Sequence, residues 1–339
     1  MSKKATAQFW DTAHRYLGHQ LKVIRQVSSH TIDSYRDCLN SFIDYLERVE
    51  NISRKKISFH NFGKETIKRY QTWMITEQGL APKTCNLRLT AIRSFLEYAA
   101  QEYLWLMPIY TDACTIAGVK TPNHAIEYFE PDEMTALLAA PSGTSRTDRR
   151  NQMMLIFLYD TAARVAEARQ VKVSDLHLDA GVPYVTLLGK GRKYRNIPLM
   201  EKTVLHLKRY LKDFHRSDPK TDLPLFYAKA HGLLHELSSD TFEKMIKRYA
   251  EQCREGGYPM PDRVHCHMIR KTRAMDLYRE GVPLPHIQQL LGHENISTTS
   301  GFYAFATLDV LAKAMEAVNP DNGVKSWSDP DILERLYRL

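Results

Sequence analysis

The sequence contains few cysteines and no paired cysteine motif. Its five cysteines are Cys38, Cys85, Cys114, Cys253 and Cys266, which are widely spaced, and no CxxC pair exists among them. Neither a structural zinc site nor a disulfide framework is therefore predicted. A reducing compartment fits this cysteine usage best, and no metal or other cofactor is expected.

Long apolar segments are also absent from the sequence. The longest apolar run is Met153–Tyr159, whereas a helix that spans a bilayer needs about 20 apolar residues. The opening segment MSKKATAQFW has basic residues but no apolar stretch of the kind that a signal peptide requires. We therefore expect no membrane association and a cytoplasmic location.

The composition is that of an ordinary globular protein. Of the 339 residues, 43% are hydrophobic and 25% are charged, and glycine and proline contribute 15 each. This length suggests two domains, and the apolar content excludes a disordered or fibrous chain. The formal net charge of +8 favours a polyanionic partner, chiefly nucleic acid.

The hydrophobic periodicity predicts a mainly helical first domain over residues 1–113. Apolar residues recur at helical spacing in 31–46, 64–77 and 82–102, and no strand pattern is present there. We expect a small bundle of four or five helices. The polar, proline-containing stretch 114–127 is predicted to be a linker.

The second domain is predicted to be helical with one small β-sheet. Two β-prone runs flank the glycine-rich turn Gly189-Lys-Gly-Arg-Lys within residues 182–199, which indicates a hairpin. Helical patterns precede and follow this hairpin, and we place the domain at 128–318. The segment 319–339 ends in an amphipathic helix with Ile332, Leu333, Leu336 and Tyr337 on one stripe.

Five short motifs in the second domain carry residue types suited to phosphate chemistry. Each alone has an ordinary structural explanation, such as a surface ion pair, a charged hairpin tip or a helix cap. In chain order they are Thr161-Ala-Ala-Arg164-Val-Ala-Glu167, Lys190 in Gly-Lys-Gly, His267-Met-Ile-Arg270, Leu290-Leu-Gly-His293, and Tyr303 after Thr298-Thr-Ser-Gly-Phe.

In this order the motifs resemble those of the tyrosine recombinases, the integrase family of phages and mobile elements. The family pattern has an Arg in a T-G-x-R-x-x-E-like segment, a β-turn Lys, H-x-x-R, and then L-G-H followed by a Tyr nine or ten residues later. Here Arg270 and His293 are 23 positions apart, and His293 and Tyr303 are ten apart. The resemblance implies a helical, SAM-like core-binding domain followed by an α+β catalytic domain.

The chemistry explains why such residues recur together. Arg164 and Arg270 would each present a permanently charged fork of donors to the non-bridging oxygens of a scissile phosphate. His267 and His293 would add hydrogen bonds or relay a proton. The resemblance implies that Tyr303 is the nucleophile and forms a 3′-phosphotyrosyl link, that Lys190 is the general acid, and that Glu167 orients an arginine.

The sequence departs from the family pattern at several positions. Ala162 and Ala163 stand where a glycine and often a leucine are usual, for which we expect a mild change of packing, and Lys271 replaces a frequent histidine. Phe302 occupies the nine-residue spacing. Either Tyr303 is the nucleophile, or Phe302 has replaced an original tyrosine and the site is inactive; we favour the first.

The partners implied are double-stranded DNA and further copies of the chain, as dimers or tetramers on DNA joined through the tail helix. An accessory DNA-bending factor is compatible with this scheme, and the resemblance implies a bacterial, nucleoid-associated protein. Candidate phosphate contacts are the basic residues Lys55, Lys56, Lys83, Arg88, Arg93, Arg192 and Arg195.

Two other functions remain open on sequence grounds. Residues Ile269–Leu291, with Gly281 at a turn, also fit a helix-turn-helix, so a non-catalytic DNA-binding or architectural protein would look similar there. A type IB topoisomerase shares the chemistry but would relax supercoils without pairing two sites. The preferred function is a site-specific recombinase or integrase that moves a mobile element.

Overall fold

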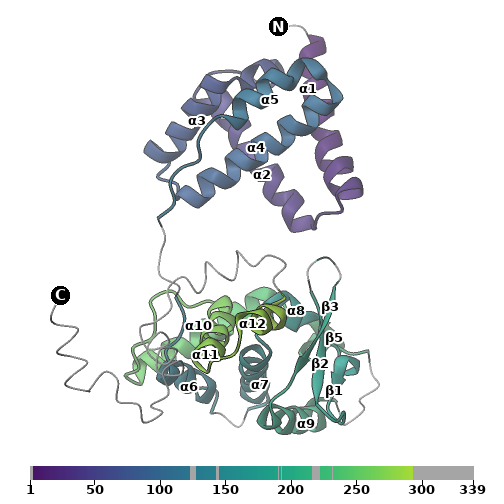
Figure 1. Cartoon of the computed structure of the whole chain (residues 1–339), viewed down its shortest axis with the longest axis vertical. Coiled ribbons are helices and arrows are strands. Elements are labelled where there is room, and N and C mark those ends of the chain that lie inside the picture. Colours follow the sequence, from purple (N-terminus) through teal and green to yellow (C-terminus); the bar gives the residue numbers. More distant parts are fainter. Residues whose placement is uncertain are drawn as a thin grey trace, which may run out of the picture. The chain divides into compact units, whose positions relative to one another are not determined.

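The computed structural model describes residues 3–122, 127–142, 145–189, 191, 193–215, 222–230 and 232–292. The chain forms two compact units, Met1–His124 and Ala125–Leu339, which are considered separately (Figure 1). The sequence predictions for Lys190, Arg192, His293, Tyr303 and the tail helix lie outside the described residues.

The first unit is a helical bundle with an aromatic core. Its longer elements are α1 (Lys3–Arg15), the π-helix η1 (Tyr16–Ile24), α2 (Ser29–Arg48), α3 (Lys64–Thr76), α4 (Pro82–Glu102) and α5 (Met107–Cys114), joined by the 3-10 turns η2 (Arg54–Lys56), η3 (Phe59–Phe62) and η4 (Leu104–Leu106). The side chains of Phe9, Phe42, Phe62 and Phe95 are almost fully buried between these helices. The predicted helical bundle is confirmed.

The chain that follows α5 is hydrogen-bonded to the first unit. Asn86 on α4 pairs with Val119 through two hydrogen bonds of 2.9 and 2.7 Å, and Gln71 on α3 donates to the Ala117 carbonyl at 2.9 Å. These bonds fix the early part of the predicted linker against α3 and α4, so this part belongs structurally to the first unit.

The second unit combines helices with two small antiparallel sheets. Its helices are α6 (Pro131–Ala139), α7 (Arg146–Thr161), α8 (Val165–Gln170), α9 (Glu201–His215), α10 (Ser239–Glu255), α11 (Cys266–Arg279) and α12 (Leu284–Leu291), with the 3-10 turn η5 (Val173–Asp175). The first sheet has the order β1 (Leu176–His177), β2 (Tyr184–Leu188), β3 (Tyr194–Pro198), and the second pairs β4 (Tyr227–Ala230) with β5 (Leu233–Glu236). The predicted hairpin around the glycine-rich turn corresponds to β2 and β3.

Helix α7 lies at the centre of the second unit and packs against α6, α8, α9 and α11. It carries the apolar run noted in the sequence, and Met154, Leu155, Phe157 and Leu158 are almost completely buried. Burying such a run stabilises the unit by roughly 1.5–3 kcal/mol per large side chain. The core therefore holds the C-terminal end of α7 firmly, and the first motif begins at that end.

Candidate active site

The first motif forms the sharp junction between α7 and α8. Helix α7 ends at Thr161, Ala162 turns the chain, and Arg164 caps the start of α8. The Glu167 side chain accepts a hydrogen bond from the Arg164 backbone N–H at 2.8 Å and another from Arg164 Nη1 at 2.8 Å. The Arg–Glu spacing seen in the sequence thus makes a local clamp that fixes the Arg164 guanidinium.

Ala162 adopts the left-handed backbone conformation, with φ +49° and ψ +28°, and is completely buried. Glycine adopts this conformation at little cost, whereas an L-residue with a side chain is strained by about 1–2 kcal/mol. The departure from the family's glycine therefore concerns backbone strain, and not only the mild change of packing expected from the sequence.

A second arginine reaches Glu167 from the β2–β3 hairpin. Arg195 on β3 donates from Nη1 and Nη2 to the two carboxylate oxygens of Glu167 at 2.9 and 2.7 Å. Burial alone would raise the pKa of Glu167, but hydrogen bonds from Arg195 and Arg164 outweigh it and lower the pKa to about 2. Glu167 is therefore an anion held between two cations.

Arg270 lies deeper than the other arginines of this region. It projects from α11, is only 3% exposed, and donates from Nη1 to the Ala162 carbonyl at 2.7 Å. Its Nη2 donates to the Leu291 carbonyl at the end of α12. Arg270 thus joins the α7–α8 junction to the end of α12.

Three arginines converge on the last turn of α12. The consecutive carbonyls of Leu290, Leu291 and Gly292 accept hydrogen bonds from Arg195 Nε at 3.1 Å, from Arg270, and from Arg164 Nη2 at 3.4 Å, respectively. Helix C-termini carry partial negative charge, so cations are stabilised there. Arg164 and Arg270 are therefore brought together at the turn that leads directly into position 293.

Gly292 is the residue that allows this close approach. It ends α12 with φ +62°, and a Cβ at this position would lie 3.2 Å from the Arg195 side chain. Gly292 thus caps the helix, which is the ordinary structural explanation that the Leu-Gly-His motif has on sequence grounds. The histidine of the Leu-Gly-His motif itself lies outside the described residues.

His267 lies one helical turn from Arg270 on α11 and is exposed at its surface. Partial desolvation and the positive charges of Arg270 and Lys271 lower the pKa of His267 to about 4. The imidazole is consequently neutral at neutral pH. A neutral ring beside two cations can accept a proton from an attacking hydroxyl group.

The base of the Lys190 hairpin lies against the same cluster. Gly189 N–H donates to the Lys193 carbonyl at 2.8 Å and closes the turn. A Cβ on Gly189 would lie 3.2 Å from Arg195 Nη1 and 3.6 Å from Glu167 Oε1. Figure 1 shows α8 and α12 along the upper side of the second unit, the side that the upper end of β3 also reaches.

The basic residues suggested as phosphate contacts differ in their environments. Lys55 and Lys56 on η2 and Lys83 on α4 are exposed, and Arg88 is half-buried. Arg93 instead donates from Nε to the Ala113 carbonyl at 3.0 Å and from Nη2 to the Ile116 carbonyl. Arg93 thus caps the end of α5, a structural use that its spacing in the sequence did not indicate.

Sequence reasoning gave Arg195 as a candidate phosphate contact and did not indicate its contacts within the protein. Its side chain is 14% exposed, and all three guanidinium nitrogens donate to protein acceptors. A signal was present in the strand alternation. Arg195 and Ile197 share one face of β3, and Arg195 pairs with the buried Leu187 on β2.

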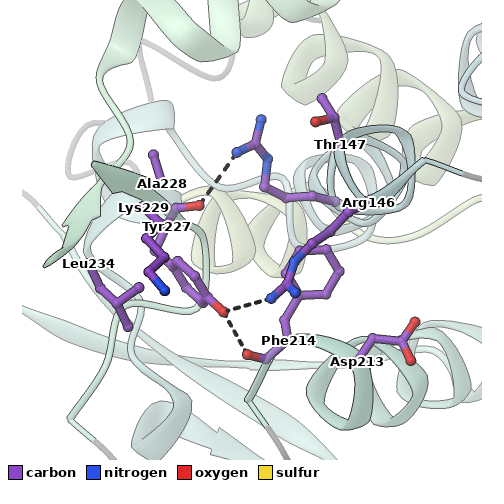
Figure 2. A pocket seen from close by; sticks show the side chains of 9 residues that line it. Arg146, Thr147, Asp213, Phe214, Tyr227, Ala228, Lys229 and Leu234 are labelled. Atoms are coloured by element: carbon purple, nitrogen blue, oxygen red, sulfur yellow. Dashed lines mark hydrogen bonds between the residues drawn. The ribbon is translucent and has the colours of Figure 1, made fainter. Parts of the chain in front are cut away.

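A second cationic region lies at the opposite end of α7. A pocket of about 590 Å³ is lined by Arg146, Arg150, Phe214, Tyr227 and Lys229, among others (Figure 2). Arg146 lies over the Phe214 ring at 4.6 Å and donates to the Tyr227 hydroxyl at 3.3 Å. Because α7 is about 24 Å long, this pocket is distinct from the arginine cluster.

Two other features of the described residues bear on the sequence predictions. Within them, no helix is both long enough and apolar enough to cross a bilayer. The same part of the chain holds no group of three or more His, Cys, Asp or Glu side chains suited to a metal ion.

Comparison with known proteins agrees with the family that the sequence motifs resemble. Residues 127–307 match the phage integrase family, and residues 14–103 match the N-terminal SAM-like domain of phage integrases. The chain belongs to the phage integrase family, the tyrosine recombinases, and is an enzyme that breaks and rejoins DNA.

Individual relatives span nearly the whole chain. It is 31% identical over 310 residues to the putative integrase/recombinase y4rC of Sinorhizobium fredii, covering 91% of this chain and 90% of that protein. It is 33% identical over 285 residues to the tyrosine recombinase XerD of Halalkalibacterium halodurans, covering 83% and 89%.

Solved structures share the fold. The XerH site-specific recombinase in its post-cleavage complex with palindromic difH substrate has a TM-score of 0.69 at 22% identity, covering 86% of this chain and 81% of that one. The Tn1549 transposon integrase in complex with transposon right end DNA has a TM-score of 0.67 at 18% identity, covering 93% and 99%. The family match and the curated relatives support the recombinase interpretation over the helix-turn-helix and topoisomerase alternatives.

Proposed function

We propose that this enzyme performs site-specific recombination with Tyr303 as the nucleophile. The Tyr303 oxygen forms a bond to the scissile phosphorus, and the bond from phosphorus to the 5′ oxygen breaks. The products are a 3′-phosphotyrosyl link and a free 5′-hydroxyl. The observation that supports this most is the convergence of Arg164 and Arg270 on the turn at Leu291 and Gly292.

The other residues have complementary roles in this scheme. Arg164 and Arg270 stabilise the negative charge that develops on the non-bridging oxygens. His267, neutral at working pH, accepts the proton of the tyrosine hydroxyl, and His293 adds a hydrogen bond to the phosphate. Lys190 donates a proton to the leaving 5′ oxygen. Glu167 orients Arg164.

The formation of a covalent adduct tests the nucleophile directly. Duplexes tiled across the DNA that flanks the gene would each carry a nick that lets the cleaved fragment diffuse away. We expect a protein–DNA adduct with wild type and with Phe302→Leu, and none with Tyr303→Phe. An adduct that survives Tyr303→Phe would assign the nucleophile to another residue.

The exposed lysines of the first unit are proposed phosphate contacts. Lys55 and Lys56 are adjacent on η2, and Lys83 is the second residue of α4. If they contact phosphates, replacing each by Gln weakens binding similarly for all DNA sequences and reduces the slope of log K against log salt by about one. Unchanged slopes would remove these residues from the interface.

We also propose that the segment 319–339 joins protomers on DNA. Its apolar stripe of Ile332, Leu333, Leu336 and Tyr337 would bury itself against a neighbouring copy, and a solved relative, lambda integrase(75-356), is a dimer bound to a COC' core site. Deleting residues 327–339 should abolish assembly beyond the monomer on DNA while leaving adduct formation on a half-site. Unchanged assembly would refute this role.

The biological context proposed is the movement of a mobile element, because curated relatives include a putative integrase/recombinase. Direct repeats flanking the gene would support this context. A location beside the chromosome's replication terminus without such repeats would favour the resolution of chromosome dimers instead.

A further inference from the structure

Arg195 occupies a position between three elements of the candidate active site. It originates on β3, donates to both Glu167 oxygens on α8, and donates from Nε to the Leu290 carbonyl on α12. The paired donors and acceptors of an arginine and a carboxylate fix both distance and plane. A single side chain therefore sets the position of the hairpin relative to α8 and to the end of α12.

Two glycines mark how tightly Arg195 is enclosed. A Cβ on Gly189 would lie 3.2 Å from Arg195 Nη1, and a Cβ on Gly292 would lie 3.2 Å from its Cδ and Nη1. These glycines directly precede Lys190 and His293 in the chain. A side chain at either glycine would therefore crowd Arg195.

The charges of the cluster give Arg195 a second effect. Glu167 carries one negative charge, which Arg164 and Arg195 share through hydrogen bonds of 2.7–2.9 Å. Without Arg195, the whole charge of Glu167 would act on Arg164. The Arg164 guanidinium would then offer less positive charge to a phosphate.

We propose that Arg195 is a positioning residue for DNA cleavage: it holds the β2–β3 hairpin against α8 and the last turn of α12, and keeps Glu167 from neutralising Arg164. This inference rests on the proposed function. It differs from the phosphate contact expected from the sequence, because the Arg195 guanidinium donates to Glu167 and to the Leu290 carbonyl within the protein.

The test compares Arg195→Gln and Arg195→Lys with the matched control Arg169→Gln. Arg169 lies on α8, is part-buried, and donates to the Leu237 carbonyl and to Ser239 Oγ, away from Glu167. Each full-length variant is assayed on the duplex that wild type cleaves. The measurements are the adduct formation rate at saturating DNA, the dissociation constant for DNA, and the melting temperature.

Loss of positioning should appear in the chemical step. We expect Arg195→Gln to lower the adduct formation rate by about 10²-fold, while the dissociation constant stays within about threefold of wild type. Arg195→Lys, which restores charge but not the planar fork, should recover only part of the rate. Arg169→Gln should cleave like wild type even if its melting temperature falls as much as that of Arg195→Gln.

A modified substrate separates positioning from general loss of structure. When sulfur replaces the scissile 5′ oxygen, the leaving thiolate needs no proton, so the contribution of Lys190 becomes dispensable. We expect this substitution to raise the rate of Arg195→Gln relative to wild type by about tenfold or more. A variant that is merely unstable would gain nothing.

Three results would overturn the proposal. The first is an adduct formation rate for Arg195→Gln that equals that of wild type at saturating DNA. The second is a higher dissociation constant for DNA together with a smaller slope of log K against log salt. The third is no gain in rate relative to wild type with the sulfur substrate. If wild type and Arg169→Gln also fail to form a Tyr303 adduct, the proposed function itself fails, which is a separate outcome.

Discussion

Ala162 at the α7–α8 junction has a left-handed backbone conformation, so we expect its replacement by glycine to change stability less than such a replacement usually does. Ala162 and Ala250 are both completely buried in the second unit, but Ala250 lies in the interior of α10. Changing either residue to glycine deletes one buried methyl group. Only the change at position 162 also relieves backbone strain, because φ there is +49°.

The expected magnitudes follow from these environments. Removing the Ala250 methyl costs about 0.8 kcal/mol, and glycine in a helix interior costs about 1 kcal/mol more, so Ala250→Gly should destabilise by about 2 kcal/mol. Ala162→Gly also loses a buried methyl group, which costs a similar amount. The greater conformational entropy of the unfolded glycine variant costs a further amount of about 0.4–1 kcal/mol of stability. Relief of about 1–2 kcal/mol of left-handed strain offsets both, so the net change should be close to zero.

Urea unfolding followed by circular dichroism measures this difference. Both variants affect the same unit, so the transition that shifts for Ala250→Gly is the one to compare in Ala162→Gly. The two should differ by about 2 kcal/mol. An equal loss of stability in both variants would refute the inference that Ala162 is strained.

The helices were predictable because their apolar residues recur in the sequence at the spacing of a helical turn. In α2, for example, Ile32, Leu39, Phe42 and Leu46 are all buried, as the spacing indicates. The β4–β5 hairpin was missed for the opposite reason. Strand β5 has the sequence Leu-Leu-His-Glu, in which apolar and polar residues do not alternate, and all four residues are exposed. The turn at Gly232 is the remaining sequence signal for this hairpin.

The sequence predicted which residues belong to the site better than it predicted the contacts between them. The spacing of Arg164 and Glu167 is local, so a helical turn predicts their contact. The pairing of Glu167 with Arg195 joins residues 28 positions apart and depends on the register of β2 and β3. From the sequence alone, a charged residue beside a glycine-rich turn looks like an exposed one. The register of β2 and β3 is needed to show that Arg195 faces the protein interior.

Three further predictions follow from the charges of the cluster and of α4. Glu167 has a pKa of about 2 in the folded protein and an ordinary value of 4.5; its stabilisation is present above pH 4.5 and is lost as the pH falls to about 2, so wild type should lose about 3 kcal/mol more than Glu167→Gln over that range in acid unfolding. Arg93→Ala should lower the unfolding free energy of the first unit by about 1–3 kcal/mol, because the Ile116 carbonyl loses the Arg93 donor and the Ala113 carbonyl loses one of its donors; a weaker affinity for DNA without lost stability would contradict this role. Partial desolvation and the charges of Arg270 and Lys271 hold the pKa of His267 at about 4, so Lys271→Gln should raise it, as followed by NMR titration of the ring. An ordinary value near 6.5 in the wild type would show instead that desolvation and the positive charges of the cluster do not reach this imidazole, and part of the molecules would then carry a protonated ring at neutral pH.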